Sequence, residues 1–288
     1  MKRIKEIFDE NVVVEDVVKK GKCLLATIND RRYVIKDKTN NDINNIFSYL
    51  LSRNFEYFPK NIIENDKYTI YQYIEDIDNP IEQKAYDMIT MLSLLHNKTT
   101  YYKDMDIDEY KEIYENISFQ IESRMNYYNN LISIIESNLF MSPSCYLIAR
   151  NISKILGALD YSKRNINEWY DLVKTKGKKR VVILYNNIDL NHIIRNKDIY
   201  LISWDKSKEG IPIYDLYNFY LKYSNIINFE NLLKHYEERY PLLEEEKKLF
   251  NILISIPKEI EFVKNEMNNC KNVKKMIDSL YKSEILIS

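Results

Sequence analysis

The stretch from Val181 to Tyr223 constrains this chain more than any other part of it. The apolar run VVIL leads into a polar loop from Tyr185 to His192. A short hairpin with alternating apolar residues follows, from Ile193 to Trp204. The last part contains GIPIYD and continues with helical spacing of its apolar residues. The pattern therefore predicts a strand, a polar loop, a hairpin and a helix that begins after a proline.

This order of elements resembles the catalytic segment of the aminoglycoside phosphotransferase and choline kinase family, including its bacterial spore-coat-kinase-like branch. The matching motifs are LHNKT, LYNNIDLNHII, LISWD and GIPIYD. The resemblance covers nearly the whole chain in element order. It implies an α+β fold of the two-lobed protein-kinase-like type, with a small antiparallel β-rich lobe over residues 1–76. A larger helical lobe over residues 77–288 would carry the catalytic-type loop at 185–205.

Short runs with alternating faces predict a β meander in the N-terminal part. We expect about five antiparallel strands and one helix within residues 10–75. The expected strands are Val12 to Val18, Lys22 to Thr27, Arg32 to Lys38, Asn61 to Glu64 and Tyr68 to Tyr73, and the expected helix is about Asp42 to Ser52.

Helical periodicity dominates after the acidic segment Ile74 to Asn79, which matches the hinge between lobes. Asn79 is expected to cap the first of these helices, with Pro80 at its first position. The later expected helices are Asp106 to Leu139, Pro143 to about Tyr161, Asn165 to Val173, Phe229 to Glu238, Leu242 to Ile256 and Ile260 to Lys282.

Lys36 is the candidate nucleotide-binding residue, because it ends the motif YVIK on the third expected strand. The resemblance implies a lysine that contacts nucleotide phosphates, whereas an ordinary outward-facing lysine explains the sequence equally well. The helix from Asp42 to Ser52 contains no Glu that would orient this lysine. The preceding turn has only Gly21, although phosphate loops use several glycines to let backbone N–H groups approach.

Three positions that carry chemistry in the family hold different residues in this chain. The resemblance places Asn187 at the position of the catalytic Asp, His192 at a metal-binding Asn and Ser203 at the principal metal-binding Asp. An amide cannot take a proton as a carboxylate does. A hydroxyl and an imidazole are also poorer ligands for Mg²⁺ than carboxylate oxygens.

Two nearby carboxylates remain as candidates for the missing roles. Asp189 follows the base position by two residues, and Asp205 matches the second acidic residue of the LISWD-type motif. By resemblance, His96 and Asp215 are structural residues that support the catalytic loop. For Asp215 we expect a buried acceptor of hydrogen bonds from the loop between Tyr185 and His192.

Two functions remain open from the sequence, with a third suggested only by kinship to the spore-coat branch. The leading hypothesis is a catalytically degenerate pseudokinase that binds an unknown protein partner or a small ligand in the interlobe cleft. The alternative is an atypical ATP-dependent phosphotransferase acting on a small hydroxylated molecule. ATP and Mg²⁺ would then be cofactors, contacted by Lys36, Asp189 and Asp205. The third is a spore or cell-envelope assembly protein.

The composition argues against several other classes of protein, including nucleic-acid-binding, membrane-spanning, disulfide-rich and zinc-binding proteins. A formal net charge of -1 argues against broad electrostatic binding of nucleic acid. The charged N-terminus and the absence of a long apolar run predict a soluble cytoplasmic protein without a membrane span. The isolated cysteines and the three histidines lack the spacing of a disulfide framework or a zinc site. The basic end of the chain, with Lys271, Lys274, Lys275 and Lys282, is expected to be a solvated helix face, ahead of membrane or nucleic-acid binding.

Overall fold

The computed structural model describes residues 14–21, 23–38, 43–65 and 67–288. The chain forms two compact units by its internal contacts. Unit 1 comprises Met1–Met91 with Tyr185–Lys208, and unit 2 comprises Leu92–Leu184 with Glu209–Ser288. These units divide the chain differently from the expected lobes of residues 1–76 and 77–288, so that lobe boundary stays a prediction. The expected strand residues Val12, Val13 and Lys22 and the helix residue Asp42 lie outside the described residues.

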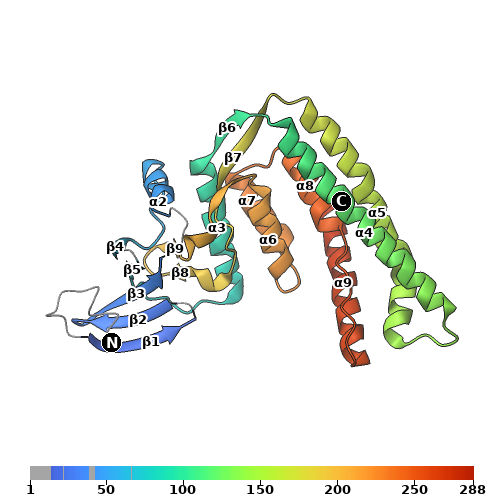
Figure 1. Ribbon diagram of the computed structural model, residues 1–288, viewed down its shortest axis with the longest axis horizontal. Coiled ribbons are helices and arrows are strands. Elements are labelled where there is room, and N and C mark those ends of the chain that lie inside the picture. The colour runs from blue at the N-terminus through green and yellow to red at the C-terminus, as the bar shows by residue number, and fades with distance from the viewer. Residues whose placement is uncertain (1–13, 22, 39–42, 66) are drawn as a thin grey trace. The chain divides into compact units, whose positions relative to one another are not determined.

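Unit 1 contains a five-stranded sheet in the order β1-β2-β3-β5-β4, whose paired strands are antiparallel (Figure 1). Ala26, Ile28, Ile35 and Ile70 form its buried apolar face, as the period of two along a strand requires. This confirms the expected antiparallel meander. The strands are β1 (Val14–Lys20), β2 (Cys23–Ile28), β3 (Arg31–Asp37), β4 (Asn61–Glu64) and β5 (Tyr68–Gln72).

An aromatic cluster joins the helix of unit 1 to the segment after Leu184. In α2 (Ile43–Ser52), Phe47 stacks on Phe58 with ring centroids 4.2 Å apart. The buried Trp204 meets the edges of both rings, at 6.0 Å and 6.1 Å. Aromatic pairs in such geometries add to the free energy of burial. The indole of Trp204 therefore anchors the end of the catalytic-type segment within unit 1.

The expected hairpin is present, but its second strand is shorter than the sequence indicated. Antiparallel pairing joins β8 (Ile193–Arg195) to β9 (Ile199–Leu201). The expected strand to Trp204 is wrong beyond Leu201, because Ser203 has a left-handed backbone (φ 65°, ψ 56°). The chain then enters a 3₁₀ turn, Trp204–Lys206.

The acidic segment after β5 holds this hairpin through one backbone hydrogen bond and one bond to a carboxylate. Ile77 N donates to Arg195 O at 2.8 Å, and Arg195 N donates to Asp76 Oδ1 at 2.9 Å. Leu201 N also donates to Tyr57 O at 2.9 Å. The hairpin and the strands of unit 1 thus form one hydrogen-bonded body, although many residues separate them in the sequence.

Unit 2 is mostly helical and includes a three-stranded sheet in the order β10-β7-β6. Helix α3 runs from the end of unit 1 into unit 2. None of the helices in the described part of the chain combines the length and apolar character that crossing a bilayer requires. The elements are α3 (Ile81–Thr99), β6 (Tyr101–Asp104), α4 (Ile107–Ser137), α5 (Pro143–Lys174), β7 (Lys178–Leu184), β10 (Lys208–Gly210), α6 (Ile213–Tyr223), α7 (Phe229–Arg239), α8 (Glu244–Ser255) and α9 (Glu266–Ile287).

Helices α4 and α5 lie side by side as a long antiparallel hairpin (Figure 1). Tyr110 stacks on Trp169 with ring centroids 5.7 Å apart. The two expected helices to Tyr161 and from Asn165 are one continuous helix, so the expected cap is wrong. Asn165 Nδ2 donates to Tyr161 O at 2.9 Å, which satisfies the amide within the helix instead of at its start.

Three further expectations about helices and strands need correction. The last helix begins at Glu266 and not at Ile260, with Asn265 accepting from Asn268 N as its cap. Strand β6 was not expected, because YYKD lacks an apolar alternation. Helix α3 begins at Ile81 and not at Pro80, and Nδ2 of Asn79, the expected cap, donates to Ile77 O at 2.7 Å.

Candidate functional site

Lys36 and Ser203 meet in unit 1 although 167 positions separate them. Strand β3 places Lys36 opposite Cys23 on β2 and Thr69 on β5. Its ammonium Nζ lies 3.2 Å from Ser203 Oγ, and both side chains are half-buried. The hydroxyl accepts this hydrogen bond, because an ammonium can only donate. The strand lysine therefore contacts the residue at the expected position of a metal-binding carboxylate.

Ser203 keeps its unusual backbone conformation through contacts with the loop before it. A φ of 65° is rare for a residue other than glycine and costs roughly 1–2 kcal/mol. Asn187 Nδ2 donates to Ser203 O at 2.7 Å, and the Tyr185 hydroxyl donates to Ile202 O. These bonds hold the strained turn in the geometry that presents the Ser203 hydroxyl to Lys36.

His192 completes a connected polar group. Its Nδ1 lies 2.9 Å from Asn187 O. A carbonyl accepts hydrogen bonds, so Nδ1 carries the proton and donates. We call Lys36, Ser203, Asn187 and His192 the lysine cluster, since each is hydrogen-bonded to the next. The structure thus brings together the expected phosphate-binding lysine and all three positions that differ from the family pattern.

The two remaining carboxylates lie in different surroundings. Asp189 Oδ1 accepts from Asn191 N at 2.9 Å and from Asn191 Nδ2 at 3.0 Å, which caps the 3₁₀ turn Leu190–His192. Asp205 is half-buried at the start of the next 3₁₀ turn. Burial, with smaller contributions from the charges of Glu64 and Asp205, raises the pKa of the Tyr71 hydroxyl to about 12. Asp205 therefore acts electrostatically on the sheet, whereas Asp189 acts within its own turn.

Helix α2 contributes an amide to unit 1 where a kinase-type helix would contribute a carboxylate. Asn44 Nδ2 donates to Glu64 Oε2 at 2.6 Å, and Lys38 Nζ lies 2.7 Å from Glu64 Oε1. The hydrogen bond from Lys38 and then the one from Asn44 lower the pKa of Glu64. The carboxylate of Glu64 thus pairs with Lys38. Among the described residues, the hydrogen-bond partner of the Lys36 side chain is Ser203.

The donor atoms of the lysine cluster do not fit a magnesium ion. Mg²⁺ prefers carboxylate and other hard oxygen ligands, but the Ser203 hydroxyl is neutral and faces an ammonium. The ring of His192 is a nitrogen ligand that already donates to Asn187 O. Within the described residues, no three side chains of His, Cys, Asp or Glu are grouped so that they could hold a metal ion.

A second polar group, entirely within unit 2, contains the two residues expected to be structural. His96 on α3 and Asp215 on α6 are fully buried, with Nε2 and Oδ2 3.2 Å apart. His96 Nδ1 lies 2.7 Å from the hydroxyl of the buried Tyr236. A tautomer that donates from Nε2 to Asp215 and accepts at Nδ1 from Tyr236 satisfies all three groups. We call these residues the histidine cluster. The expected bonds between Asp215 and the loop Tyr185 to His192 stay a prediction.

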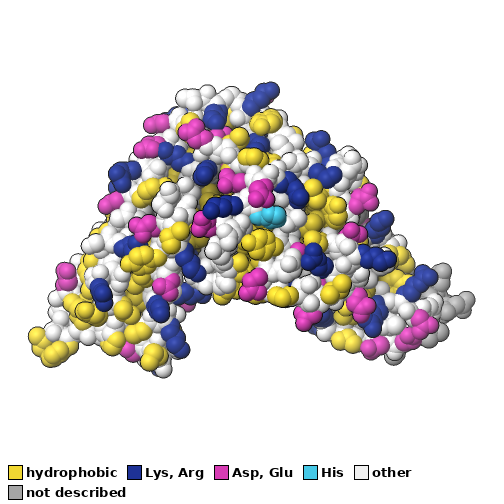
Figure 2. Space-filling view, turned by 180° about the vertical axis from the view of Figure 1, so that it is seen from behind, with side chains coloured by type: hydrophobic (Ala, Val, Ile, Leu, Met, Phe, Trp, Pro, Cys, Tyr) yellow, Lys and Arg dark blue, Asp and Glu magenta, His cyan; other side chains and the backbone are white. Residues whose placement is uncertain are grey.

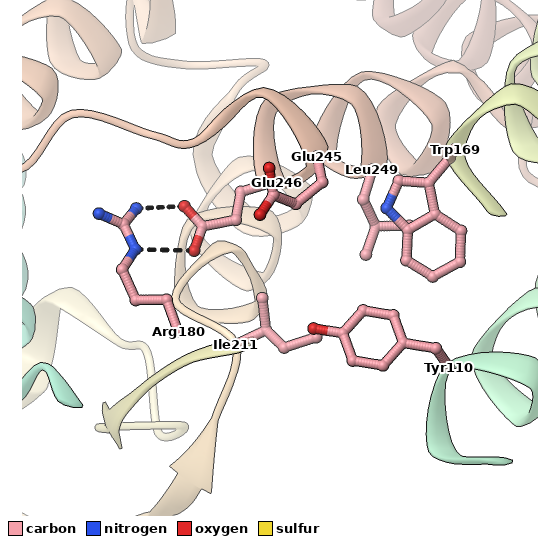
Figure 3. Close-up of a pocket in the computed structure, with 7 residues that line it drawn as sticks. All are labelled: Tyr110, Trp169, Arg180, Ile211, Glu245, Glu246 and Leu249. Carbon is pink, nitrogen blue, oxygen red and sulfur yellow. Dashed lines mark hydrogen bonds and ion pairs between the residues drawn. The ribbon is translucent and has the colours of Figure 1, made fainter. Parts of the chain in front are cut away.

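A small cavity in unit 2 lies beside a buried ion pair and is unsuited to a ligand (Figure 3). Arg180 Nε donates to Glu246 Oε1 at 2.9 Å, and its Nη2 donates to Glu246 Oε2. Burial opposes the charge of Arg180, but the hydrogen bond with Glu246 leaves the pKa of the guanidinium raised. The cavity volume is about 10 Å³, which is the space of roughly one water molecule.

Sequence reasoning missed several residues that position the lysine cluster. Trp204 was expected on a strand, and its aromatic contacts had no sequence signal beyond its place in LISWD. Asp76 lay in the expected hinge, but nothing in the sequence paired it with Arg195. Such pairings depend on contacts between distant segments, which periodicity does not encode.

Comparison with known proteins yields structural matches and no sequence matches. No protein-family model matches the sequence, and no curated protein matches it. An aminoglycoside phosphotransferase from Alicyclobacillus acidocaldarius is similar in structure, with a TM-score of 0.66 and 9% identity over 95% of this chain and 90% of that one.

Two further solved structures cover almost the full length of the chain. The AMP-bound complex of spectinomycin phosphotransferase APH(9)-Ia has a TM-score of 0.57 and 15% identity, over 100% of this chain and 96% of that one. Choline kinase LicA from Streptococcus pneumoniae has a TM-score of 0.52 and 17% identity, over 96% and 98%. The chain therefore has the protein-kinase-like fold that aminoglycoside phosphotransferases and choline kinase share, as the sequence motifs predicted.

Proposed function

We propose that this protein is a pseudokinase that binds a ligand or a partner at the lysine cluster and does not transfer phosphoryl groups. The observation that carries the proposal is the 3.2 Å contact between Lys36 Nζ and Ser203 Oγ. Phosphoryl transfer depends on positioned cations and on carboxylates that hold them. A neutral hydroxyl that solvates an ammonium supplies neither the charge nor the ligand geometry for magnesium-bound triphosphate.

The loop before Ser203 supports the same proposal. At the position of the catalytic base, the Asn187 amide donates to a backbone carbonyl and has no proton-accepting carboxylate. Asp189, the closest carboxylate in sequence, accepts two hydrogen bonds from Asn191 within its own turn. A general base must lie within hydrogen-bond reach of the hydroxyl that it activates. Both residues act here as supports of the loop.

The ligand class follows from the charge of the cluster. Lys36 is a half-buried cation whose hydrogen-bond partner is the neutral Ser203 hydroxyl, and Asn187 and His192 support the segment that carries this hydroxyl. A small anion or a nucleotide bound without metal fits such a site better than a magnesium complex, because no carboxylate of the cluster would repel it. Such a ligand would change the binding of a protein partner only by being bound, without any transfer of a phosphoryl group.

Calorimetric titration with ATP, in the presence and absence of Mg²⁺, tests the proposal. We expect Mg²⁺ to raise ATP affinity by less than about twofold, because the cluster has no ligand set for the ion. In the triple variant Asn187→Asp, His192→Asn and Ser203→Asp, Mg²⁺ should raise the affinity by at least about tenfold. Asp tolerates left-handed backbone better than most residues, so the change at Ser203 is compatible with its φ.

The matched control uses a second lysine near the same strand. Lys36→Met should weaken any binding of metal-free ATP, whereas Lys38→Met should not, because Lys38 pairs with Glu64. Tight binding of Mg²⁺-ATP by the unmodified protein, followed by turnover, would refute the pseudokinase proposal.

One observation favours the alternative, an atypical phosphotransferase. Asp205 is half-buried and its charge contributes to the raised pKa of Tyr71, so a carboxylate does lie near the sheet. Proteins named spectinomycin phosphotransferase and choline kinase share the fold, which makes small hydroxylated molecules the substrates to test. If ATP is turned over, Asp205→Asn should abolish turnover, and the exposed control Asp198→Asn should leave it intact.

A further inference from the structure

The end of the α4–α5 hairpin exposes an apolar apex to solvent. Leu139 is 90% exposed, Phe140 is 85% exposed and Met141 is 45% exposed. In the described part of the chain, no other three consecutive large apolar residues are all exposed. Figure 2 shows apolar side chains protruding at the lower left, where this hairpin ends. Single exposed apolar residues are ordinary, but a contiguous group at a turn indicates an interaction site.

Hydrogen bonds hold the backbone of this apex in place. Asn138 N donates to Ile135 O at the end of α4, and Ser142 Oγ accepts from Cys145 N at the start of α5. Glu266 on α9 accepts from Ser144 N at 2.7 Å. The apolar side chains are therefore presented outward by two capped helix ends and do not belong to an unstructured linker.

The shape and size of the apex disfavour a second copy of the chain as its occupant. Three side chains of this size expose at most about 500 Å², well below the roughly 800 Å² that each partner buries in a stable protein pair. A narrow apolar apex is suited to entering the interfacial region of a bilayer, where its side chains leave water without needing a matching pocket.

Helix α9 begins beside this apex and carries a concentration of positive charge. Its first residue, Glu266, is the one that contacts Ser144. A groove on α9 is lined by four lysines and a single acidic residue, although the whole chain has a net charge of -1. The lysines are Lys271, Lys274, Lys275 and Lys282, and the acidic residue is Asp278.

Most of this charge has no protein partner. Lys282 Nζ donates to Ser224 O at 2.6 Å. Among the ion pairs of the described residues, none involves Lys271, Lys274 or Lys275. By helix rise, Lys271 lies only about 8 Å along the axis from Glu266, which is close to the Debye length of roughly 8 Å at physiological salt. The first of these charges therefore lies within about one Debye length of the start of α9, where Glu266 contacts Ser144.

We propose that this end of unit 2 is a peripheral binding site for an anionic lipid bilayer. Leu139, Phe140 and Met141 enter the interfacial region, and Lys271, Lys274 and Lys275 attract anionic headgroups. An interfacial bilayer offers both an apolar region for the apex and anionic headgroups for the lysines, so a surface with both properties fits it best. The site is independent of the lysine cluster and of the proposed pseudokinase function.

Co-sedimentation with lipid vesicles tests this site on the full chain. We expect the protein to bind phosphatidylcholine vesicles containing about a quarter phosphatidylglycerol, with weaker binding as salt rises, and to bind pure phosphatidylcholine poorly. The variant Lys271→Glu, Lys274→Glu and Lys275→Glu should bind the anionic vesicles at least about fivefold less tightly, since one lysine within a Debye length of an anionic surface contributes about fivefold. The variant Leu139→Ser and Phe140→Ser should lose at least about tenfold.

Matched controls lie on the same hairpin but far from its end. Phe119 is 74% exposed on α4, and Lys163 is exposed on α5. By helix rise they lie roughly 27 Å and 30 Å from the apex. Phe119→Ser and Lys163→Glu should leave vesicle binding within about twofold. Circular dichroism of every variant should match the unmodified protein, because all substituted side chains are exposed.

Three outcomes would overturn the proposal. The first is failure of the unmodified protein to sediment with anionic vesicles at low salt. The second is undiminished vesicle binding by the apex variant, which would leave the lysines as a general polyanion site. The third is loss of self-association of the apex variant in light scattering with no change in vesicle binding, which would make the apex a contact between copies.

Discussion

The lysine cluster of unit 1 and the histidine cluster of unit 2 are both built from polar residues that the sequence singled out, but they differ in burial and charge. The lysine cluster is half-buried, contains no carboxylate and includes a residue with a left-handed backbone. The histidine cluster is fully buried and joins an imidazole to a carboxylate and a hydroxyl. Because of these differences in burial and charge, we expect the histidine cluster to stabilise the fold and the lysine cluster to be available to a ligand.

Burial makes the histidine cluster a stabilising element. An unpaired polar group away from water costs free energy, so each member must keep its partner. The half-buried lysine cluster can exchange its internal bonds for bonds to water or a ligand at little cost. The chemistry of the buried cluster is therefore more tightly constrained than that of the half-buried one.

Asp215→Ala should give the largest loss of stability, because it disrupts the fully buried histidine cluster. The change leaves Nε2 of the buried His96 without its acceptor, which should lower the free energy of unfolding by about 1–3 kcal/mol. Urea unfolding followed by circular dichroism measures the loss. The control is Asp171→Ala, since Asp171 is an exposed residue that pairs with Lys174 and should change stability by less than about 0.5 kcal/mol.

An Asp215→Ala variant as stable as the unmodified protein would contradict the structural role of the histidine cluster. Tyr236→Phe offers a second measurement, because it removes only the hydroxyl that lies 2.7 Å from His96 Nδ1. Its loss should be smaller than that of Asp215→Ala, because a neutral hydrogen bond is weaker than one to a carboxylate.

Much of the fold could be predicted from sequence because it depends on local patterns. Alternating residues predicted the strands of unit 1, and helical spacing predicted α4 to within two residues at each end, whereas α9 starts six residues and ends five residues later than expected. The errors have physical causes. Asn165 reads as a cap, but its amide is satisfied inside α5 by Tyr161 O. The strand expected to Trp204 is ended by the left-handed Ser203, which no periodicity signals.

The candidate site was predictable in its residues but not in its geometry. Motif matching named Lys36 and Ser203, yet the contact between them joins segments 167 positions apart. The role of Asp189 was also undetermined, since only coordinates show that its carboxylate accepts from Asn191. Roles of this kind depend on side-chain direction and on long-range packing, which a single sequence does not specify.

Two substitutions at Ser203 test the strained backbone of the lysine cluster. Their expected effect on the free energy of unfolding is intermediate. Ser203→Ala and Ser203→Gly both remove the hydroxyl that Lys36 contacts. Only glycine relieves the left-handed backbone, so the Gly variant should be about 1 kcal/mol more stable than the Ala variant. Differential scanning calorimetry measures the difference.

The same pair of substitutions at Ser133 is the control, because Ser133 is an exposed residue within α4. There the order should reverse, with alanine more stable than glycine by about 1 kcal/mol. Equal stabilities of the two Ser203 variants would show that the turn relaxes freely and that its geometry is not imposed by Asn187.

The smallest expected effect on stability comes from Glu266. Its carboxylate can be compared with that of the buried Asp215. The backbone N–H of Ser144, followed by the Ser144 hydroxyl and the Asn269 amide, lowers the pKa of Glu266 to about 2. A carboxyl group with a lowered pKa in the folded state stabilises that state above its ordinary pKa, and the stabilisation is lost as pH falls toward the folded pKa. The difference in urea midpoint between the unmodified protein and Glu266→Gln should therefore be constant above about pH 5 and shrink toward pH 2.

Ser144→Ala separates the contributions to this pH dependence. It removes the hydroxyl but keeps the backbone N–H, which is the largest cause of the lowered pKa. Most of the pH dependence should therefore survive in Ser144→Ala and disappear in Glu266→Gln. If both variants lose the pH dependence equally, the hydroxyl of Ser144, and not its backbone N–H, holds Glu266. The end of the α4–α5 hairpin would then depend on a single hydroxyl, and Ser144→Ala should weaken vesicle binding as well.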